Sequence, residues 1–287
     1  MTDTMKVLFL GFGYVARATA RALAGRARLM ATARDCGTAD ALRAQGIAPV
    51  IAATDRAALA DAAGAASHIL VSAPPGAAGD PFLGLIGPDV LEARWVGYLS
   101  TTGVYGDRRG GWAFEWDTPR PTQERSVKRL EAEQGWQDAG ARIFRLAGIY
   151  GPGRSALDAL REGRARRIIR HGHVFSRIHV DDIASALVLA MARPEASGVI
   201  NLADDCPSSQ SKVVEEAARL LGVEPPMEEA FDAGAMSAML ASFYAESRRV
   251  SNARARQVLG WRPAYPSYRE GLAAIHASEK ASTAPAP

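Results

Sequence analysis

Short apolar runs alternate with alanine-rich amphipathic stretches through the first 150 residues. The apolar runs have the length of buried strands, and strands are expected at residues 6–12, 27–34, 48–54, 68–75, 95–101 and 141–151. Helices are expected between them, at residues 14–25, 38–46, 55–64 and 121–136. This alternation is typical of βαβ units and predicts an α/β fold, a Rossmann doubly wound parallel sheet.

The alternation loosens after Tyr150, which predicts a smaller C-terminal substrate lobe above the sheet. Three further elements are expected, namely a helix at 181–192 capped by Asp181 or Asp182, a strand at 198–204 and a lobe helix at 208–222. The predicted domains are therefore a Rossmann dinucleotide-binding domain, a substrate lobe and a disordered tail of low complexity. They comprise residues 1–150 and 176–205, residues 151–175 and 206–272, and residues 273–287, respectively.

The composition is that of an ordinary globular protein, with 48% hydrophobic and 23% charged residues in a chain of 287. The longest apolar runs are broken by glycine and are too short to cross a bilayer, so no membrane partner is expected. The N-terminus lacks the pattern of a signal peptide. Cys36 and Cys206 are the two cysteines, which gives no disulfide framework and no metal-ligand spacing. We therefore expect no metal and a cytoplasmic location.

A basic segment at residues 161–173 stands out in a chain whose net charge is only +3. It holds five arginines and two histidines, and could follow a nucleic-acid backbone. No aromatic residue lies between them, however, as stacking on bases would require. We favour a solvated helix end with one or two arginines facing a small phosphate ligand, and expect no nucleic-acid partner.

GFGYVA, at residues 11–16, matches the G-x-G-x-x-G/A dinucleotide pattern between the first strand and the first helix. Gly11 permits the tight turn, Gly13 lets the backbone approach a pyrophosphate, and Ala16 lets the helix pack close to the strand. The helix that Tyr14 and Val15 open would bind the phosphates at its N-terminus. Ala73, in the fourth predicted strand, completes the set of expected cofactor contacts.

The second strand indicates which cofactor is preferred. NAD-binding sites usually have a carboxylate at the end of this strand, but here Ala33 occupies that place and Arg34 follows. A guanidinium can bind a 2′-phosphate through charge-assisted hydrogen bonds. The sequence therefore predicts NADP(H) in preference to NAD(H). Asp35 leaves an alternative open, because a shift of one residue in the alignment of this strand end would restore an acid there.

Four further segments, in order behind GFGYVA, resemble the extended short-chain dehydrogenase/reductases, which include the nucleotide-sugar epimerases and dehydratases. They are LSTTGVYGD (99–107), FRLAGIYGPGR (144–154), RIHVDDIA (177–184) and NLADD (201–205). The resemblance covers residues 5–272 and is greatest to atypical, epimerase/dehydratase-like members. It implies an NAD(P)-dependent oxidoreductase acting on a nucleotide-linked or other polar, anionic small molecule.

The resemblance implies a catalytic set that this chain matches only in part. Family members take a proton with a Tyr, assisted by a Lys four residues later and by a Ser or Thr three residues before the Val of VYG. Thr101 matches the Ser/Thr position, but the Tyr and Lys positions fall on Arg125 and Arg129. An arginine cannot be a base at neutral pH, because its pKa exceeds about 12. An alternative register would use Glu124 and Lys128 instead.

Arg125 and Arg129 lie four residues apart in the helix expected from Pro121, with Thr122 as its N-cap. Two cations on one helix face repel each other unless an anion lies between them. We therefore predict that Thr101, Arg125 and Arg129 form the catalytic site, with both arginines binding an anionic ligand in the cofactor cleft. The alternative is a catalytically silent NADP-binding redox sensor or regulatory protein.

Other side chains near the motifs admit simpler interpretations. Tyr105 of VYG is expected to pack beneath the site, and His179 to end a strand rather than bind a metal. Trp112 and Trp116 either cover a ligand or pack in the lobe. Family dimers commonly pair long helices, whereas residues 74–95 are rich in Pro and Gly and leave room only for a short helix. The oligomeric state therefore stays open.

Overall fold

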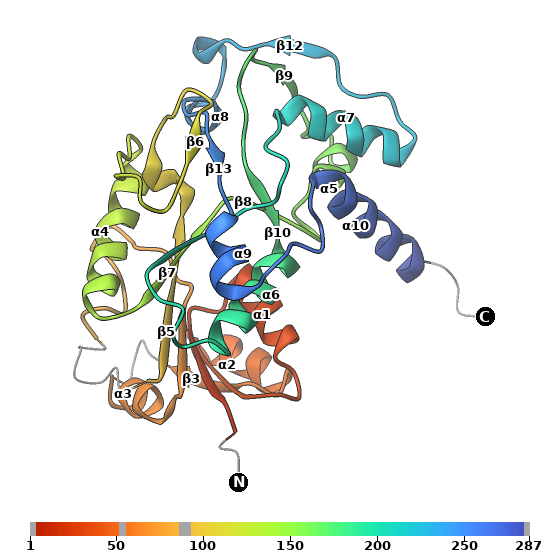
Figure 1. Cartoon of the computed structure of the whole chain (residues 1–287). Coiled ribbons are helices and arrows are strands. Elements are labelled where there is room, and N and C mark those ends of the chain that lie inside the picture. The colour runs from red at the N-terminus through yellow and green to blue at the C-terminus, as the bar shows by residue number, and fades with distance from the viewer. Residues whose placement is uncertain (1–3, 52–55, 86–92, 284–287) are drawn as a thin grey trace.

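A parallel sheet of seven strands forms the centre of the molecule in the computed structural model, which describes residues 4–51, 56–85 and 93–283 (Figure 1). The strand order is β11-β7-β5-β4-β1-β2-β3. The bounds are β1 (Lys6–Leu10), β2 (Arg28–Ala33), β3 (Ala48–Ile51), β4 (His68–Val71), β5 (Trp95–Thr101), β7 (Arg142–Leu146) and β11 (Val199–Leu202). The order reverses at β1 and β4, so the predicted doubly wound fold is confirmed.

Helices cover both faces of this sheet because successive strand residues point to opposite faces and both sets are apolar. In β1, Val7 and Phe9 face one cluster, while Leu8 and Leu10 face the other, and all four are fully buried. The first cluster includes α1 (Tyr14–Ala22), α2 (Cys36–Arg43), α6 (Val180–Met191) and α9 (Ala253–Leu259). The second includes α3 (Arg56–Ala65) and α4 (Glu124–Asp138).

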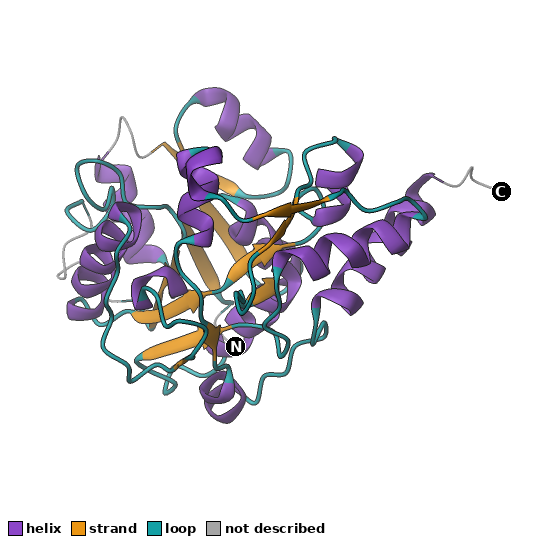
Figure 2. Ribbon diagram, turned by 90° about the horizontal axis from the view of Figure 1, so that it is seen from above, coloured by secondary structure: helices purple, strands orange, loops and turns teal. Residues whose placement is uncertain are grey.

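The smaller lobe lies over the carboxyl ends of the strands, and Figure 2 shows its C-terminal helix extending away from the sheet. Its helices are α5 (Ala156–Arg161), α7 (Gln210–Leu221), α8 (Ala238–Tyr244) and α10 (Tyr268–Thr283), with 3-10 turns η2 (Thr102–Tyr105) and η3 (Ala233–Ala235) nearby. Three parallel strand pairs connect it to the sheet domain or brace it. They are β8 (Gly148–Tyr150) with β10 (Arg177–His179), β9 (Arg167–Ile169) with β12 (Glu228–Ala230), and β6 (Trp112–Ala113) with β13 (Arg249–Val250).

The single strand expected at 141–151 is wrong, because the chain changes partners in the middle of it. The Ala147 amide still donates to Leu202 of β11, at 3.0 Å, but the next amide, of Gly148, donates to Ser176 beside β10, at 3.1 Å. The residues before this step therefore form β7 in the main sheet. The residues after it form β8, which carries the chain into the lobe.

The tail prediction for 273–287 is also wrong as far as Thr283, where α10 ends. Leu272 and Ile275 are almost fully buried in a lobe cluster with Val213 and Ala217 of α7. This packing stabilises a helix in a segment whose composition suggested disorder. Residues 284–287 lie outside the described residues, as do 86–92, within the expected short helix, and 52–54, at the end of the third expected strand.

Two predicted helix caps are also corrected. Gln123, not Thr122, precedes α4, and the Thr122 hydroxyl instead donates to Glu246 at 2.6 Å. His179, not an aspartate, caps α6, because its Nδ1 accepts from the Asp181 amide at 3.3 Å. The Asp182 carboxylate accepts from two amides of the 264–265 segment. Longer-range partners thus hold these side chains away from the caps.

Four of the five arginines of the basic segment at 161–173 pair with carboxylates of their own chain. Arg161 pairs with Glu279 at 2.6 Å, and Arg167 pairs with Glu215 at 2.8 Å and with Glu228 at 3.0 Å. Arg166 pairs with Glu229, and Arg164 with Glu162. These ion pairs tie β9 to β12 and α5 to α10, so the segment braces the lobe.

Candidate functional site

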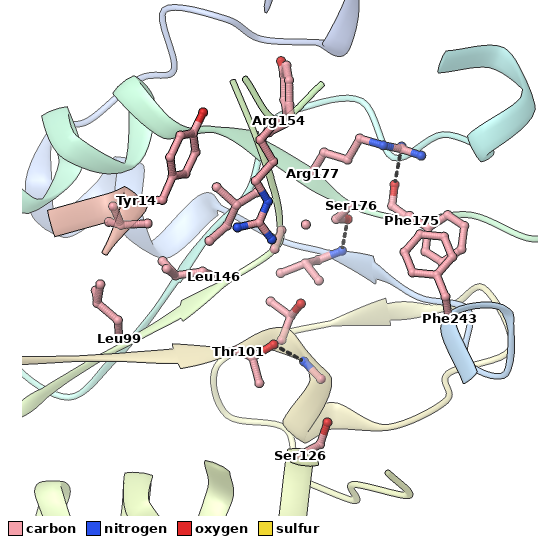
Figure 3. A pocket seen from close by; sticks show the side chains of 18 of the residues that line it. Tyr14, Leu99, Thr101, Ser126, Leu146, Arg154, Phe175, Ser176, Arg177 and Phe243 are labelled. Carbon is pink, nitrogen blue, oxygen red and sulfur yellow. Dashed lines mark hydrogen bonds between the residues drawn. The ribbon is translucent and has the colours of Figure 1, made fainter. Parts of the chain in front are cut away.

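A cavity of about 870 Å³ lies between the carboxyl ends of the strands and the lobe (Figure 3). Its wall contains Gly13, Tyr14 and Val15 of the dinucleotide motif together with Thr101, Arg125 and Arg129. The fold therefore brings the predicted cofactor turn and the predicted catalytic residues to one space. Gly11, Ala16, Arg34 and Ala73 are not part of this wall.

The turn after β1 has room for a pyrophosphate. Gly11 has φ +86°, and a Cβ there would lie 2.8 Å from the Ala73 amide nitrogen, so both backbone conformation and space require glycine. Gly13 precedes α1 without a side-chain cap, and a Cβ on it would meet no protein atom within 4 Å. Ala16 is fully buried. The first amides of α1 are thus free to bind phosphate, and the turn fits a dinucleotide.

Tyr14 connects this turn to the lobe. Its hydroxyl donates to the Pro152 carbonyl oxygen at 2.9 Å, and burial raises its pKa to about 12. The phenol therefore stays protonated at neutral pH and acts as a hydrogen-bond donor. Because Pro152 lies in the segment that enters the lobe, Tyr14 fixes the lobe relative to the phosphate-binding turn.

Arg34 follows β2 directly and is exposed, and no described carboxylate forms an ion pair with it. Asp35, the alternative acid, instead caps α2 and accepts from the Thr38 amide at 2.7 Å. This hydrogen bond lowers the pKa of Asp35. The carboxylate is therefore engaged by its own helix, which weakens the interpretation that it binds a ribose.

Thr101 and Ser126 are among the hydroxyl-bearing residues that line the cavity near the end of β5. Thr101 caps η2, and its Oγ1 accepts from the Gly103 amide at 3.1 Å. Ser126 is 4% exposed, and a Cβ placed on Gly103 would lie 2.7 Å from its Oγ and 3.3 Å from Thr101 Oγ1. The two side chains therefore flank Gly103. Sequence reasoning missed Ser126, because nothing in its local pattern separates it from other helix serines.

Arg125 and Arg129 both line the main cavity and a neighbouring one of about 530 Å³ against residues 74–77. Arg129 donates from Nη1 to the Leu99 carbonyl oxygen at 2.5 Å. Its Cζ lies 5.9 Å from the centre of the Tyr98 ring. Arg125 is exposed and has no carboxylate partner among the described residues. Both side chains therefore have access to a ligand in the cleft.

The alternative acid/base pair lies to one side of the main cavity. Glu124 and Lys128 form an exposed ion pair of 2.7 Å and line only the smaller cavity. The hydrogen bond and charge of Lys128 lower the pKa of Glu124. A carboxylate with a lowered pKa is a weaker base, which argues against this register.

Arg154 is a cavity residue that sequence reasoning missed. Its backbone exchanges two hydrogen bonds with Gly151, at 3.0 and 3.3 Å, so a tight turn positions it. Its guanidinium points into the cavity (Figure 3), with Cζ 5.9 Å from the centre of the Tyr14 ring. No described carboxylate pairs with it. The sequence signal was the arginine that ends FRLAGIYGPGR, which only the folded turn brings to the cofactor motif.

Buried polar groups support the floor of the cavity. The Tyr105 hydroxyl donates to Asn201 Oδ1 at 2.8 Å, and burial raises the pKa of this tyrosine. Tyr105 therefore packs beneath the site, in agreement with the prediction. Beside it, Glu133 pairs with Arg145 at 2.5 Å and accepts from the Ser100 hydroxyl at 2.6 Å. This network joins α4 to β5 and β7.

Trp112, Trp116 and His179 are not part of the cavity wall. Trp112 is 50% exposed and Trp116 is 75% exposed, the latter stacked on Phe114. His179 is buried, and the described residues contain no group of three potential metal-binding side chains. The aromatic residues that do line the cavity are Phe175, Phe243, Tyr150 and Tyr268, in addition to Tyr14.

Comparisons with known proteins include a solved structure that is similar in sequence over almost the whole chain. It is described as a functionally unknown conserved protein from Silicibacter pomeroyi DSS, 42% identical, with a TM-score of 0.88. The comparison covers 96% of this chain and all of the other. No family model matches.

A curated relative, the 3-diazoavenalumate denitrifying reductase of a Streptomyces species, is 33% identical over 169 residues. That match covers 54% of this chain and 55% of the relative, so the chain spans only about half the length of the curated protein it matches. Within the described residues, no helix combines the length and apolar character needed to cross a membrane.

Two more distant structures share the fold. One is MoeE5 in complex with UDP-glucose and NAD, 20% identical with a TM-score of 0.75, over 97% of this chain and all of that one. The other is the human epimerase family protein SDR39U1 with NADPH, 15% identical with a TM-score of 0.71, over 95% and 99% of the two chains. The architecture is thus that of epimerase-like short-chain dehydrogenase/reductases.

Proposed function

Because this chain belongs to the same family as the conserved Silicibacter pomeroyi protein and has the fold of the epimerase-like short-chain dehydrogenase/reductases, we propose that it is an NADP(H)-dependent oxidoreductase acting on a small anionic substrate. One observation carries the proposal. The guanidinium groups of Arg125, Arg129 and Arg154 reach the cavity that contains the dinucleotide turn, and none pairs with a described carboxylate.

The chain provides the groups that a nicotinamide dinucleotide needs. Gly13 and the first amides of α1 would hold the pyrophosphate, Gly11 and Ala73 shape the turn beneath it, and Arg34 would bind a 2′-phosphate. When bound, the cofactor supplies or accepts a hydride. The neighbours' NAD and NADPH complexes support a nicotinamide cofactor, and the preference for NADP(H) rests on Arg34.

The arginines at positions 125 and 129 suit charge stabilisation rather than proton transfer. A guanidinium remains protonated throughout the neutral range, so it cannot take the place of a proton-transferring Tyr. Placed beside a substrate, it stabilises negative charge that develops during reduction. The hydroxyls of Thr101 and Ser126 can orient a polar substrate group by hydrogen bonding.

Arg125 and Arg129 stand where the resembled family has its proton-transferring Tyr and Lys. This difference also favours a second candidate, a catalytically silent NADP-binding redox sensor or regulatory protein. The decisive experiment follows NADPH oxidation when the purified chain is incubated with NADPH and 4-hydroxycinnamate. In parallel, it follows NADP+ reduction when the chain is incubated with NADP+ and UDP-glucose. Hydride transfer in either assay supports an oxidoreductase. NADPH binding without turnover on a broad panel of anionic substrates would favour the regulatory protein.

Arg125→Ala tests the role of the fixed positive charge. We expect binding of an anionic substrate to weaken by about 1.5–3 kcal/mol, the range for hydrogen bonds to charged groups, with NADPH affinity retained. Calorimetry on the NADPH-saturated protein measures it. Arg26→Ala, an exposed arginine beyond α1, is the matched control. Equal substrate affinity in both variants would remove Arg125 from the site.

A further inference from the structure

The lobe end of the main cavity exposes apolar and aromatic side chains to a ligand. The rings of Phe175 and Phe243 stack with centroids 4.2 Å apart and 24° between their planes. Phe243 keeps 42% of its surface exposed, and Figure 3 shows both rings at the edge of the cavity. Val213 and Leu272 line the cavity from α7 and α10. This end therefore offers a ligand an aromatic face and aliphatic walls.

Arg177 and Arg248, two charged side chains at the same end, already have partners within the protein. Arg177 donates to the carbonyl oxygens of Phe175 and Ser208, at 3.3 and 2.9 Å, and to Gln210 Oε1 at 2.9 Å. Arg248 pairs with Glu246 at 2.6 Å, and the same carboxylate accepts from Thr122. A ring bearing several hydroxyls would have to break these bonds to satisfy its own, at a cost in binding.

The arginines at the two ends of the cavity also differ in whether they already have a partner. In the lobe end of the cavity wall, Arg248 is neutralised by Glu246, and Arg177 is engaged by a backbone carbonyl oxygen and by Gln210. Arg154 and Arg125, which no described carboxylate pairs with, lie nearer the dinucleotide turn and α4. The cavity therefore offers guanidinium groups without a carboxylate or backbone partner among the described residues toward the cofactor motif, and an aromatic face toward the lobe. A ligand that matches both ends has an acid group joined to an apolar planar body.

We propose that this oxidoreductase takes aromatic carboxylic acids, with the ring of the acid against Phe243 and its carboxylate turned toward Arg154 and Arg125. This inference rests on the proposed function and narrows its substrate class. The additional stabilisation of an aromatic–aromatic contact requires an aromatic ring in the ligand, whereas the aliphatic walls alone would accept any apolar body of similar size. The proposal therefore distinguishes planar from puckered rings of equal charge.

The test compares trans-cinnamate with 3-cyclohexylpropanoate, which have the same charge and similar length but differ in the planarity of the ring and its linker. Each is titrated by calorimetry into the full chain saturated with NADPH, and UDP-glucose is titrated in parallel. We expect cinnamate to bind most tightly. Phe243→Ala should weaken it about tenfold, and Phe243→Leu, which keeps apolar volume, should also weaken it.

Trp116→Ala removes an exposed aromatic residue outside the cavity and should leave cinnamate affinity unchanged. Circular dichroism and the melting temperature verify that each variant is folded. The proposal is overturned by equal binding of the puckered acid, by tighter binding of UDP-glucose, or by unchanged cinnamate affinity in both folded Phe243 variants. Failure of NADPH to bind contradicts the proposed function instead, and titration of the cofactor-free chain then still tests the aromatic site.

Discussion

At the end of β2, the Arg34 side chain is the feature that would distinguish NADPH from NADH. Because Asp35 is occupied by capping α2, Arg34 is the charged side chain left to meet the 2′-phosphate. We expect Arg34→Ala to weaken NADPH binding by about 1.5–3 kcal/mol and to leave NADH binding unchanged. Calorimetry with both cofactors measures it, and an equal loss for NADH would contradict the assignment.

Asp204, just after β11, gives stability a pH dependence. Burial raises its pKa to about 7, although an amide of Cys206 and the charge of Arg177 oppose the shift. The unfolded state has an ordinary carboxyl pKa near 3.9, so the folded state binds the proton more tightly. Stability contributed by this proton is present at pH 4 and is lost as pH rises toward 7 and above.

Asp204→Asn should therefore raise the free energy of unfolding at pH 8 by about 1–3 kcal/mol, and by less at pH 5. Asn keeps the Oδ1 atom that accepts from the Cys206 amide at 3.1 Å. Urea unfolding at the two pH values measures the difference. Asp61→Asn, on the exposed side of α3, serves as control. An identical change at both pH values would show that Asp204 is ionised in the folded protein at each.

Among the elements, α4 depends on one buried ion pair. Glu133 and Arg145 are 2% and 4% exposed, and their contact holds the helix against β7, with Ser100 of β5 on the same carboxylate. Removing one member leaves the other charge buried without its partner. We expect Glu133→Ala to lower the free energy of unfolding by about 3–5 kcal/mol, measured by urea denaturation.

Glu131→Ala is the matched control, because Glu131 lies two residues earlier on the exposed surface of the same helix. Its loss should change stability by less than about 0.5 kcal/mol. A comparable loss in both variants would indicate that helix propensity, rather than the buried pair, stabilises α4. Retained stability in Glu133→Ala would show that Arg145 can find water or another acceptor.

The sheet elements were predictable from sequence because their signals are local. Apolar runs, glycine turns and alanine-rich helices each require only neighbouring residues, and the strands from β1 to β5 lie where those signals place them. The break between β7 and β8 could not be predicted, because it depends on Ser176, which lies far away in the chain. Likewise, the packing of Leu272 and Ile275 of α10 against α7 joins residues that lie far apart in the sequence.

At the scale of the whole molecule, the parts of the site also divide into those with a local sequence signal and those that depend on contacts between distant segments. The dinucleotide turn was found because GFGYVA is a contiguous motif, and Thr101 because it belongs to another. Ser126, Arg154 and Phe243 reach the cavity from three separate segments, and their roles arise only when the lobe closes over the sheet. Sequence reasoning could place the arginines of 161–167 in one segment but could not show the distant glutamates that neutralise most of them.

The lobe is built from segments that lie far apart in the sequence, and this has a consequence for folding during synthesis on the ribosome. Leu157 of α5 is fully buried against a cluster that includes Leu272 of α10, 115 residues later in the chain (272 − 157). At about 5–20 residues per second, the ribosome needs about 6–23 s to produce the second residue after the first. Until α10 is made, the apolar face that α5 shares with α7 lacks the side chains of Leu272 and Ile275. The sheet can gain its early strands during translation, whereas the lobe is completed only by α10, the C-terminal helix of the described residues.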